Sequence, residues 1–169
     1  VFSLIENSTT LLVLDADALN CVAKQPEILL KKKAPIIITP HPGEMSRLTG
    51  LATPLVNAER ERVALDFAQK YGVVTVLKGA GTVIASPNGK VLVNPTGNSG
   101  MATGGSGDVL AGMTASILAQ GASAFSSAAA AVYLHGLAGD IAAEKYGKIS
   151  MLPTDLINCI PLAYKRCGF

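Results

Sequence analysis

Runs of apolar residues bounded by turn-forming residues mark the first elements that the sequence predicts. They lack the polar alternation of a half-exposed strand, which is typical of strands covered on both faces of a sheet. The pattern predicts buried strands at residues 10–14, 36–39 and 73–77. Residues 82–85 and 90–93 are predicted to form a β-hairpin, because Ser86-Pro87-Asn88-Gly89 between them ends in Asn-Gly, which favours a tight turn with positive φ.

Helical periodicity occupies the segments between and after these strands. Charged and apolar side chains are spaced over residues 58–70 as in an amphipathic surface helix. An apolar stripe at i, i+4 and i+8 predicts a helix over residues 108–119. Two more helices are expected, one capped by Ser123 and reaching about Lys145, and one that begins at Thr154 and that Pro161 should kink.

Strands followed by helices across long connections predict a layered α/β fold. We expect a mostly parallel sheet with a β-hairpin at one side, helices on both faces, and a single domain over residues 1–169. In such sheets ligands bind beyond the carboxyl ends of the strands. Chemistry is therefore expected just after residues 14, 39 and 77, and at residues 104–108.

Composition narrows the class of protein further. Hydrophobic residues make up 49% of the chain and charged residues 15%, a balance that excludes disorder. The net charge is only +2, so nucleic acid is a poor candidate as a partner, and the basic run Lys31–Lys33 is interpreted as the solvated end of a short helix. Residues 109–139 carry no formal charge, but Gln120, Gly121 and His135 interrupt them, which favours two tightly packed helices over a membrane span.

The cysteines and the first residues indicate in which cellular compartment the protein is expected. The three cysteines are odd in number and show no C-x-x-C spacing, so we expect reduced thiols in a cytoplasmic protein. No secretory signal opens the chain, and its first residue is Val1 rather than Met. We expect residues upstream of Val1.

The most informative motif is Thr103-Gly104-Gly105-Ser106-Gly107-Asp108, which leads directly into a predicted helix. Glycines let the backbone approach a ligand, and the free N–H groups of the helix start attract an anion. A phosphate or a developing negative charge is expected there, with Asp108 at its mouth as a base or a metal-related group that acts on a hydroxyl. Alternatively, Asp108 only complements the helix dipole and the glycines form a packing turn.

A second glycine-rich turn, Lys78-Gly79-Ala80-Gly81-Thr82, follows a buried strand. Lys78 is placed to neutralise phosphate, and the glycines could admit a nucleotide. The turn is not a Walker A loop. A connection into the hairpin accounts for it nearly as well.

Polar residues also follow the other two strands. Two prolines restrain the backbone around His41, which favours a contact role, whereas Glu44 could be a helix N-terminal acid or a group related to a metal. Asp15 and Asp17 could both point into the cleft, although we favour Asp17 as the N-cap of a short helix. His135 is interpreted as a core or interface histidine rather than a catalytic one, and Asp140 as the end of an apolar helix face.

Together these motifs resemble a known family. DADALN at 15–20, TPHPGE at 39–44, LKGAGT at 77–82, and NPTGN followed by GMATGGSGDVLAG to residue 112, with YLHG further on, are similar to the ADP- or ATP-dependent NAD(P)H-hydrate dehydratases of the ribokinase-like superfamily. The resemblance covers nearly the whole chain in the family's motif order. Because the family domain is longer and begins with further strands, the resemblance implies that residues 1–169 are the C-terminal portion of such a domain, truncated at its N-terminus.

The resemblance implies a repair reaction in which hydrated NADH or NADPH is dehydrated at the expense of ADP or ATP with Mg²⁺. It also implies roles for residues. Asp108 would deprotonate the ring hydroxyl, and Gly105, Ser106 and Gly107 would hold the transferring phosphoryl group. The remaining implied contacts are His41, Asn98 and Asp108 to the hydrated nicotinamide nucleotide, Lys78, Gly79, Ala80, Gly81, Thr82 and Gly107 to the adenine nucleotide, and Glu44 indirectly to the metal.

The expected binding partners and two alternative functions follow from the same motifs. We expect a homo-oligomer, no nucleic acid and no membrane as partners, and an NAD(P)HX epimerase that is fused or separate. One alternative is a ribokinase-like kinase of a small molecule such as hydroxymethylpyrimidine or hydroxyethylthiazole. Another is a fragment that binds nucleotide without turnover.

Overall fold

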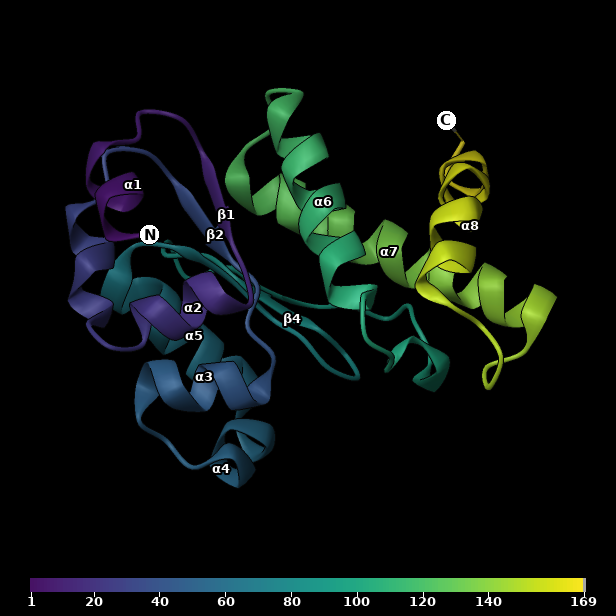
Figure 1. Cartoon of the computed structure of the whole chain (residues 1–169), viewed down its shortest axis with the longest axis horizontal. Coiled ribbons are helices and arrows are strands. Elements are labelled where there is room, and N and C mark those ends of the chain that lie inside the picture. The colour runs from purple at the N-terminus through teal and green to yellow at the C-terminus, as the bar shows by residue number, and fades with distance from the viewer. Residues whose placement is uncertain (169) are drawn as a thin grey trace.

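The computed structural model describes residues 1–168, which form a five-stranded mixed sheet between two layers of helices (Figure 1). The strands follow the sheet in chain order, parallel from β1 to β3 and antiparallel from β3 to β5. Their bounds are β1 Leu12–Leu14, β2 Ile36–Ile38, β3 Val74–Leu77, β4 Val83–Ala85 and β5 Val91–Val93. The layered α/β fold with a hairpin at one side is therefore confirmed, and each strand lies within two residues of its predicted bounds.

The first half of the chain supplies one helical layer, and the second half supplies the other (Figure 1). On one face lie α1 Phe2–Asn7, α2 Asp17–Val22, the 3₁₀ helix η1 Pro26–Lys31, α3 Pro42–Thr49, α4 Thr53–Ala58 and α5 Arg60–Tyr71. The other layer contains α6 Ser106–Ala119, α7 Ala124–Tyr146 and α8 Pro153–Arg166, preceded by the short 3₁₀ helix η2 Ser99–Met101.

Side chains of successive strand residues enter different cores, because their direction alternates along a strand. On β2, Ile36 and Ile38 pack into the core beneath α1 to α5, whereas Ile37 packs against the layer of α6 to α8. All three are at most 1% exposed. This double burial explains why the strand carries no polar alternation.

The hairpin between β4 and β5 forms as predicted, but its turn differs in detail. Only Gly89 has a positive φ, 92°, whereas Asn88 does not. The N–H of Ser86 donates to the carbonyl of Lys90 at 2.9 Å and closes the loop. The Asn-Gly pair therefore supplies one left-handed residue rather than two.

The predicted helices are present, with shifts at their ends. Ser123 is the N-cap of α7, and its hydroxyl accepts the N–H of Ser126 at 3.2 Å. The last helix begins at Pro153 rather than Thr154 and is continuous through Pro161. Lys31 lies in the last turn of η1, as expected for a basic residue at a helix end.

Asp17 is not the N-cap of α2, so that prediction is wrong. Ala16 occupies the cap position with a φ of 50°, and Asp17 is the first helical residue. The carboxylate of Asp17 instead accepts a hydrogen bond from the side chain of Asn20 at 3.3 Å. The positive φ of Ala16 lets the helix begin one residue earlier than predicted, at Asp17 itself.

The expected absence of a membrane span and the expected state of the cysteines can both be compared with the structure. Within residues 1–168, no helix combines the length and the apolar character needed to cross a bilayer. The long α7 packs against both α6 and α8. Cys21, Cys159 and Cys167 carry free thiols.

Candidate functional site

A cavity of about 920 Å³ opens beyond the carboxyl ends of the parallel strands. We call its two sides the strand wall and the helix wall. The strand wall is formed by His41, Pro42 and the turn 78–82. The helix wall is formed by most of the segment 94–107 together with residues of α6 and α7. The cavity therefore brings together three of the four places where the sequence predicted chemistry.

His41 enters the strand wall through the start of α3. Its Nδ1 accepts the N–H groups of Gly43 at 3.0 Å and Glu44 at 3.3 Å, and Oε2 of Glu44 accepts the N–H of His41 at 2.8 Å. This reciprocal arrangement is a capping box with histidine in place of serine or threonine. The imidazole is held through Nδ1, with its side chain half exposed at 51%.

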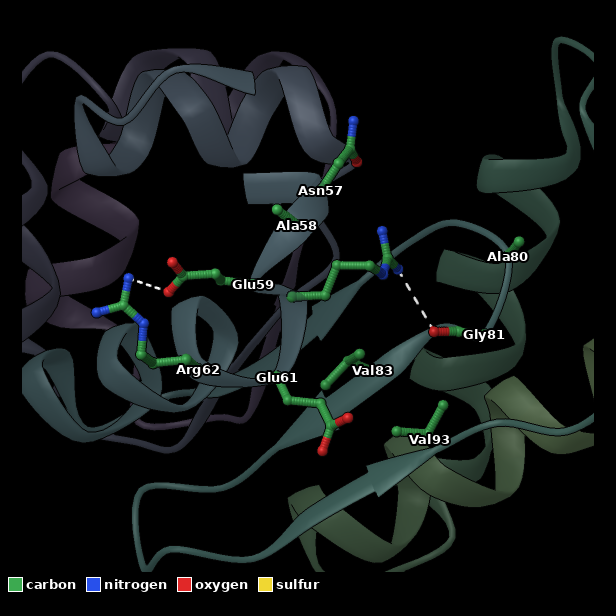
Figure 2. Close-up of a pocket in the computed structure, with 10 residues that line it drawn as sticks. Asn57, Ala58, Glu59, Glu61, Arg62, Ala80, Gly81, Val83 and Val93 are labelled. Carbon is green, nitrogen blue, oxygen red and sulfur yellow. Dashed lines mark hydrogen bonds and ion pairs between the residues drawn. The ribbon is translucent and has the colours of Figure 1, made fainter. Parts of the chain in front are cut away.

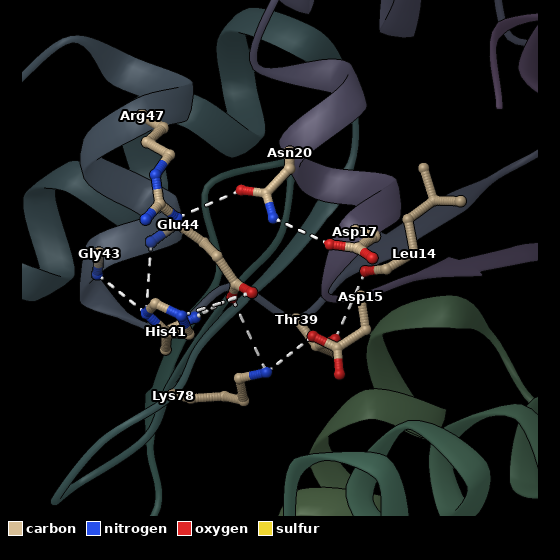
Figure 3. Close-up of polar contacts among 10 residues, drawn as sticks. All are labelled: Leu14, Asp15, Asp17, Asn20, Thr39, His41, Gly43, Glu44, Arg47 and Lys78. Carbon is tan, nitrogen blue, oxygen red and sulfur yellow. Dashed lines mark hydrogen bonds and ion pairs between the residues drawn. The ribbon is translucent and has the colours of Figure 1, made fainter.

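Lys78 is the centre of a compact group of charges, shown in Figure 3. Its ammonium donates to Oδ1 of Asp15 at 2.7 Å, and Oε2 of Glu44 lies 3.9 Å away. The three charged groups are largely buried, with 19%, 13% and 7% of the Lys78, Asp15 and Glu44 side chains exposed. Lys78 is therefore positioned by two carboxylates, one directly after β1 and one in the first turn of α3.

The turn after Lys78 is supported from outside by Arg60, the first residue of α5. Its Nη2 donates to the carbonyl oxygens of Leu77 at 2.8 Å and Gly81 at 3.5 Å. Gly79 has a φ of 149°, and a Cβ there would lie 2.7 Å from Nη1 of Arg60, so its backbone conformation and this close contact both favour glycine. Burial lowers the pKa of Arg60 below its ordinary value.

Figure 2 shows the outer side of the same turn, where a hollow of about 470 Å³ lies between the start of α5 and the hairpin. Ala80 and Gly81 line both this hollow and the main cavity. The turn 78–82 is thus a thin partition, and Arg60 fixes it from the hollow's side.

The helix wall begins with the glycine bend before α6. Gly105 is the N-cap with a φ of 97°, a conformation that favours glycine. Ser106 is 6% exposed, and its Oγ has no hydrogen-bond partner. A Cβ at Gly107 would lie 3.4 Å from the ammonium of Lys78 and 3.8 Å from Oδ2 of Asp15. The start of α6 and the lysine of the strand wall therefore meet at Gly107.

His135 lies behind the start of α6. It is 8% exposed, and its Nε2 is 2.9 Å from the carbonyl oxygen of Ser106, to which the protonated nitrogen donates. Burial lowers its pKa to about 4, with a smaller contribution from the positive charge of Lys78, so the ring is neutral at pH 7. The prediction of a core histidine is confirmed, and the residue also lines the cavity.

The segment 94–101 forms the rest of the helix wall and lies directly on α7. The side chain of Asn94 donates to the carbonyl of Val132 at 3.5 Å, and the hydroxyl of Thr96 donates to that of Tyr133 at 2.9 Å. The side chain of Asn98 donates to the carbonyl of Gly139 at 3.0 Å. Three side chains of the segment thus donate to backbone carbonyls of the same helix, α7.

The predicted site residues converge on this cavity, with the exceptions of Asp108 and Glu44. The cavity is lined by His41, Asn98, Gly105, Ser106, Gly107 and all five residues of the turn 78–82. Asp108 is exposed on the first turn of α6 and is not part of the lining. Both interpretations of Asp108, a base at the mouth or a partner of the helix dipole, fit this position.

Glu44 lies beside the cavity rather than in its lining. Its carboxylate caps the backbone of His41, which is the role expected of a helix N-terminal acid. Across residues 1–168 no three His, Cys, Asp or Glu side chains gather into a metal-binding group. A bound Mg²⁺ commonly keeps several waters and takes only one or two carboxylates besides substrate phosphates. Asp15 and Glu44 are two such carboxylates beside the cavity, although both face the ammonium of Lys78. The role of Glu44 toward a metal remains a prediction.

Two residues that the sequence did not indicate, Arg60 and Asp140, form hydrogen bonds that support the walls of the cavity. Arg60 was counted only among the charges of an amphipathic helix, and Asp140 only as the end of an apolar face. Both bind segments at least 17 residues away along the chain, so no local pattern reveals their contacts.

A glycine-rich helix start and a partly buried lysine that face one cavity at the strand ends are typical of α/β proteins that bind phosphorylated ligands. Residues 1–162 match the family model of the NAD(P)H-hydrate dehydratases. The chain therefore belongs to the NAD(P)H-hydrate dehydratase family.

Individual relatives agree with the family model. The chain is 47% identical over 154 residues to the bifunctional NAD(P)H-hydrate repair enzyme Nnr of Moorella thermoacetica, covering 91% of this chain and 29% of that protein. It is 42% identical over 146 residues to the ADP-dependent (S)-NAD(P)H-hydrate dehydratase of Neisseria meningitidis, covering 85% and 49%.

A solved structure supports the ribokinase-like architecture. The crystal structure of the ADP/ATP-dependent NAD(P)H-hydrate dehydratase of Bacillus subtilis, co-crystallised with ATP and Mg²⁺, superposes with a TM-score of 0.87 at 36% identity. The alignment covers 96% of this chain and 57% of that one. The chain thus spans about half the length of single-function relatives and less than a third of the bifunctional one.

Proposed function

We propose that this chain is the C-terminal portion of a ribokinase-like dehydratase domain that restores NADH or NADPH from the hydrated cofactors at the expense of ADP or ATP. Membership of the family supports the reaction. The observation that carries the proposal is the convergence of Lys78, His41 and the start of α6 on one cavity of about 920 Å³.

The nucleotide belongs, in this proposal, between the turn 78–82 and the start of α6. Lys78 supplies a positive charge within reach of Gly107, and the N–H groups at the start of α6 supply donors. The unpartnered hydroxyl of Ser106 is a further polar group in the lining. Together they would hold the transferring phosphoryl group, and loss of one such donor typically costs about 10²- to 10³-fold in rate.

The hydrated nicotinamide would lie toward His41 and Asn98. Asp108 takes the proton of the ring hydroxyl, whose oxygen attacks the terminal phosphorus of the nucleotide and displaces the shortened nucleotide. The C–O bond then breaks as the ring nitrogen donates its electron pair, and phosphate leaves. Loss of a proton from the neighbouring ring carbon restores the double bond, so water departs as part of the phosphate.

Mg²⁺, when bound, neutralises the phosphate charges. The carboxylates of Asp15 and Glu44 are the candidates to hold it, Glu44 through water because only 7% of its side chain is exposed. A cytoplasmic location, a homo-oligomer and an epimerase partner are parts of the same proposal.

A direct assay tests the function. The full-length protein should restore the reduced-nicotinamide absorbance when incubated with hydrated NADH, Mg²⁺ and either ADP or ATP. A kinase of hydroxymethylpyrimidine or hydroxyethylthiazole would instead yield only a phosphorylated alcohol. Nucleotide binding without dehydration by residues 1–169 alone, together with activity of the full-length protein, would favour a binding fragment.

A variant tests the base. Asp108→Asn should abolish turnover and leave nucleotide affinity within a few-fold, because the nucleotide is held by other groups. Asp66→Asn is the matched control, since Asp66 is also an exposed helical aspartate but lies on α5. Near-normal turnover of Asp108→Asn would remove Asp108 from this role.

A further inference from the structure

Asp140 on α7 makes two hydrogen bonds to the segment 94–101 of the helix wall. The N–H of Gly97 donates to its Oδ2 at 2.9 Å, and Nδ2 of Asn98 donates to its Oδ1 at 2.9 Å. Hydrogen bonds to an ionised acceptor are shorter and stronger than neutral ones. A single carboxylate therefore fixes both the backbone and the side chain at this point of the cavity.

The side chain of Asn98 also contacts two other backbone groups, one on α7 and one in η2. The same Nδ2 donates to the carbonyl of Gly139, while its Oδ1 accepts the N–H of Gly100 at 3.0 Å and caps the short helix η2. With Asp140 on one side and Gly100 on the other, the orientation of the amide is determined. Its oxygen cannot exchange places with its nitrogen without losing these contacts.

The surface of α7 beneath the segment is shaped for this close approach. A Cβ at Gly136 would lie 2.8 Å from the backbone of Thr96, and a Cβ at Gly139 would overlap the side chain of Met101. Both glycines lie on the turn of α7 that leads to Asp140. The segment thus packs closely against the glycines of α7, and hydrogen bonds to Asp140 hold it there.

Asp140 supplies a charge where the segment has none. Residues 94–107 contain no charged side chain, yet nearly all of them line the cavity. Asp140 itself is not part of the lining. Its carboxylate acts on the cavity only through Gly97 and Asn98.

We propose that Asp140 is a positioning residue that holds Gly97 and Asn98 in the orientation required to bind the hydrated nicotinamide substrate. The proposal rests on the proposed function for the identity of that substrate. It predicts that Asp140 affects recognition of the hydrated cofactor and not of the adenine nucleotide. The nucleotide turn at 78–82 belongs to the opposite wall and is fixed by Arg60.

Asp140→Asn in the full-length protein tests this role. The amide keeps one acceptor oxygen, and its NH₂ group faces a donor, so one of the two bonds is replaced by a repulsive contact. We expect the KM for hydrated NADH to rise about 10- to 100-fold, as for loss of a hydrogen bond to a charged group. The kcat should stay within about threefold and the ADP dissociation constant within about twofold.

Glu144→Gln is the matched control. Glu144 lies one turn further along α7, and its carboxylate pairs with Arg166 at 2.8 Å. Glu144→Gln makes the same change, from carboxylate to amide, away from the cavity. Its KM should equal that of the parent. If Asp140→Asn and Glu144→Gln have the same KM, or if Asp140→Asn weakens ADP binding as much as substrate binding, the proposal is overturned.

A second readout does not depend on activity. Amide hydrogen exchange at Gly97 and Gly100 should become faster in Asp140→Asn and stay unchanged in Glu144→Gln, whereas exchange at residues 78–82 should be unaffected in both. Unchanged exchange at Gly97 overturns the positioning role even if the parent protein is active. A parent protein that fails to dehydrate hydrated NADH, but shows the expected exchange pattern, overturns the proposed function and leaves the restraint on the segment established.

Asp140→Glu provides a second variant if Asp140→Asn does not fold. It keeps the charge but moves the carboxylate by one methylene, so the two bonds cannot both keep their geometry. The KM for hydrated NADH should rise and the ADP dissociation constant should not. A parent-like KM in this variant, together with parent-like exchange at Gly97, also overturns the proposal.

Discussion

The two walls of the cavity are held in place by different forces. The strand wall depends on charges, since Lys78 is bound between Asp15 and Glu44 and the turn behind it is fixed by Arg60. The helix wall depends on close backbone contact, with Asp140 as its anchor and glycine as the residue that permits the approach.

This difference matches the chemistry expected on each side. A charged wall suits phosphates, because solvent screens the charge of a partly buried lysine less than that of an exposed one. An uncharged wall of backbone and amide groups suits a nicotinamide ring, which is recognised by shape and hydrogen bonds. Stability should therefore respond to charge removal in the strand wall and to added volume in the helix wall.

Removal of the Lys78 charge should have the largest effect. Lys78→Met leaves two largely buried carboxylates without their partner, which should lower the free energy of unfolding by about 3 kcal/mol or more. Nucleotide affinity should fall at least tenfold. Urea denaturation and nucleotide titration of the full-length variant measure both effects.

Lys31→Met is the control for this prediction. Lys31 pairs with Glu6 at 2.9 Å, but their side chains are 62% and 38% exposed. Surface pairs of this kind contribute about 0–1 kcal/mol. Equal losses in the Lys78 and Lys31 variants would contradict the view that burial makes the strand-wall pair important.

Acid should weaken the helix wall through His135. Its pKa is about 4 in the folded protein and 6.5 ordinarily, so the unfolded chain takes up the proton first as the pH falls. The free energy of unfolding should thus be unaffected above pH 6.5 and should fall by about 3 kcal/mol between pH 6.5 and about 4.

His135→Gln isolates this contribution, because glutamine can donate to the carbonyl of Ser106 but cannot be protonated. Urea denaturation from pH 7 to pH 4 should show a smaller decline in the variant than in the parent. Identical declines would mean that His135 is not held neutral by burial.

The strands and the glycine motifs could be predicted because their signals are local. Ile36 to Ile38 form an unbroken apolar run, and Gly105 directly precedes the helix that it caps. The contacts that hold the walls are not local. Arg60 meets the carbonyl of Leu77 and Asp140 meets Gly97 only after the chain has folded, so their sequence positions suggested surface charges and no more.

The error at Asp17 has a similar cause. Aspartate before a helix is a sound indication of an N-cap, but here the strand passes into the helix through Ala16 with positive φ, which shifts Asp17 into the helix itself. Asp15 was only suggested as a cleft-facing carboxylate. Its bond to Lys78 joins residues 63 positions apart, which no spacing rule anticipates.

Added volume in the helix wall should have a moderate effect. Gly136→Ala places a Cβ against the backbone of Thr96, which cannot move without disturbing the segment 94–101. Overpacking of this kind costs about 1–3 kcal/mol, and thermal or urea unfolding should show it. Gly139→Ala should cost less, because its obstacle is the flexible side chain of Met101. The reverse order would contradict the backbone contact as the dominant restraint.

The smallest effect should have the opposite sign. Gly112 lies inside α6, and a Cβ there would meet nothing within 4 Å. Gly112→Ala should therefore raise the free energy of unfolding by about 0.5–1 kcal/mol, because alanine loses less backbone entropy than glycine in a helix. Urea denaturation of this variant beside Gly136→Ala compares the same substitution on two helices of the helix wall. If both variants were destabilised alike, the cost at Gly136 could not be attributed to its contact with Thr96.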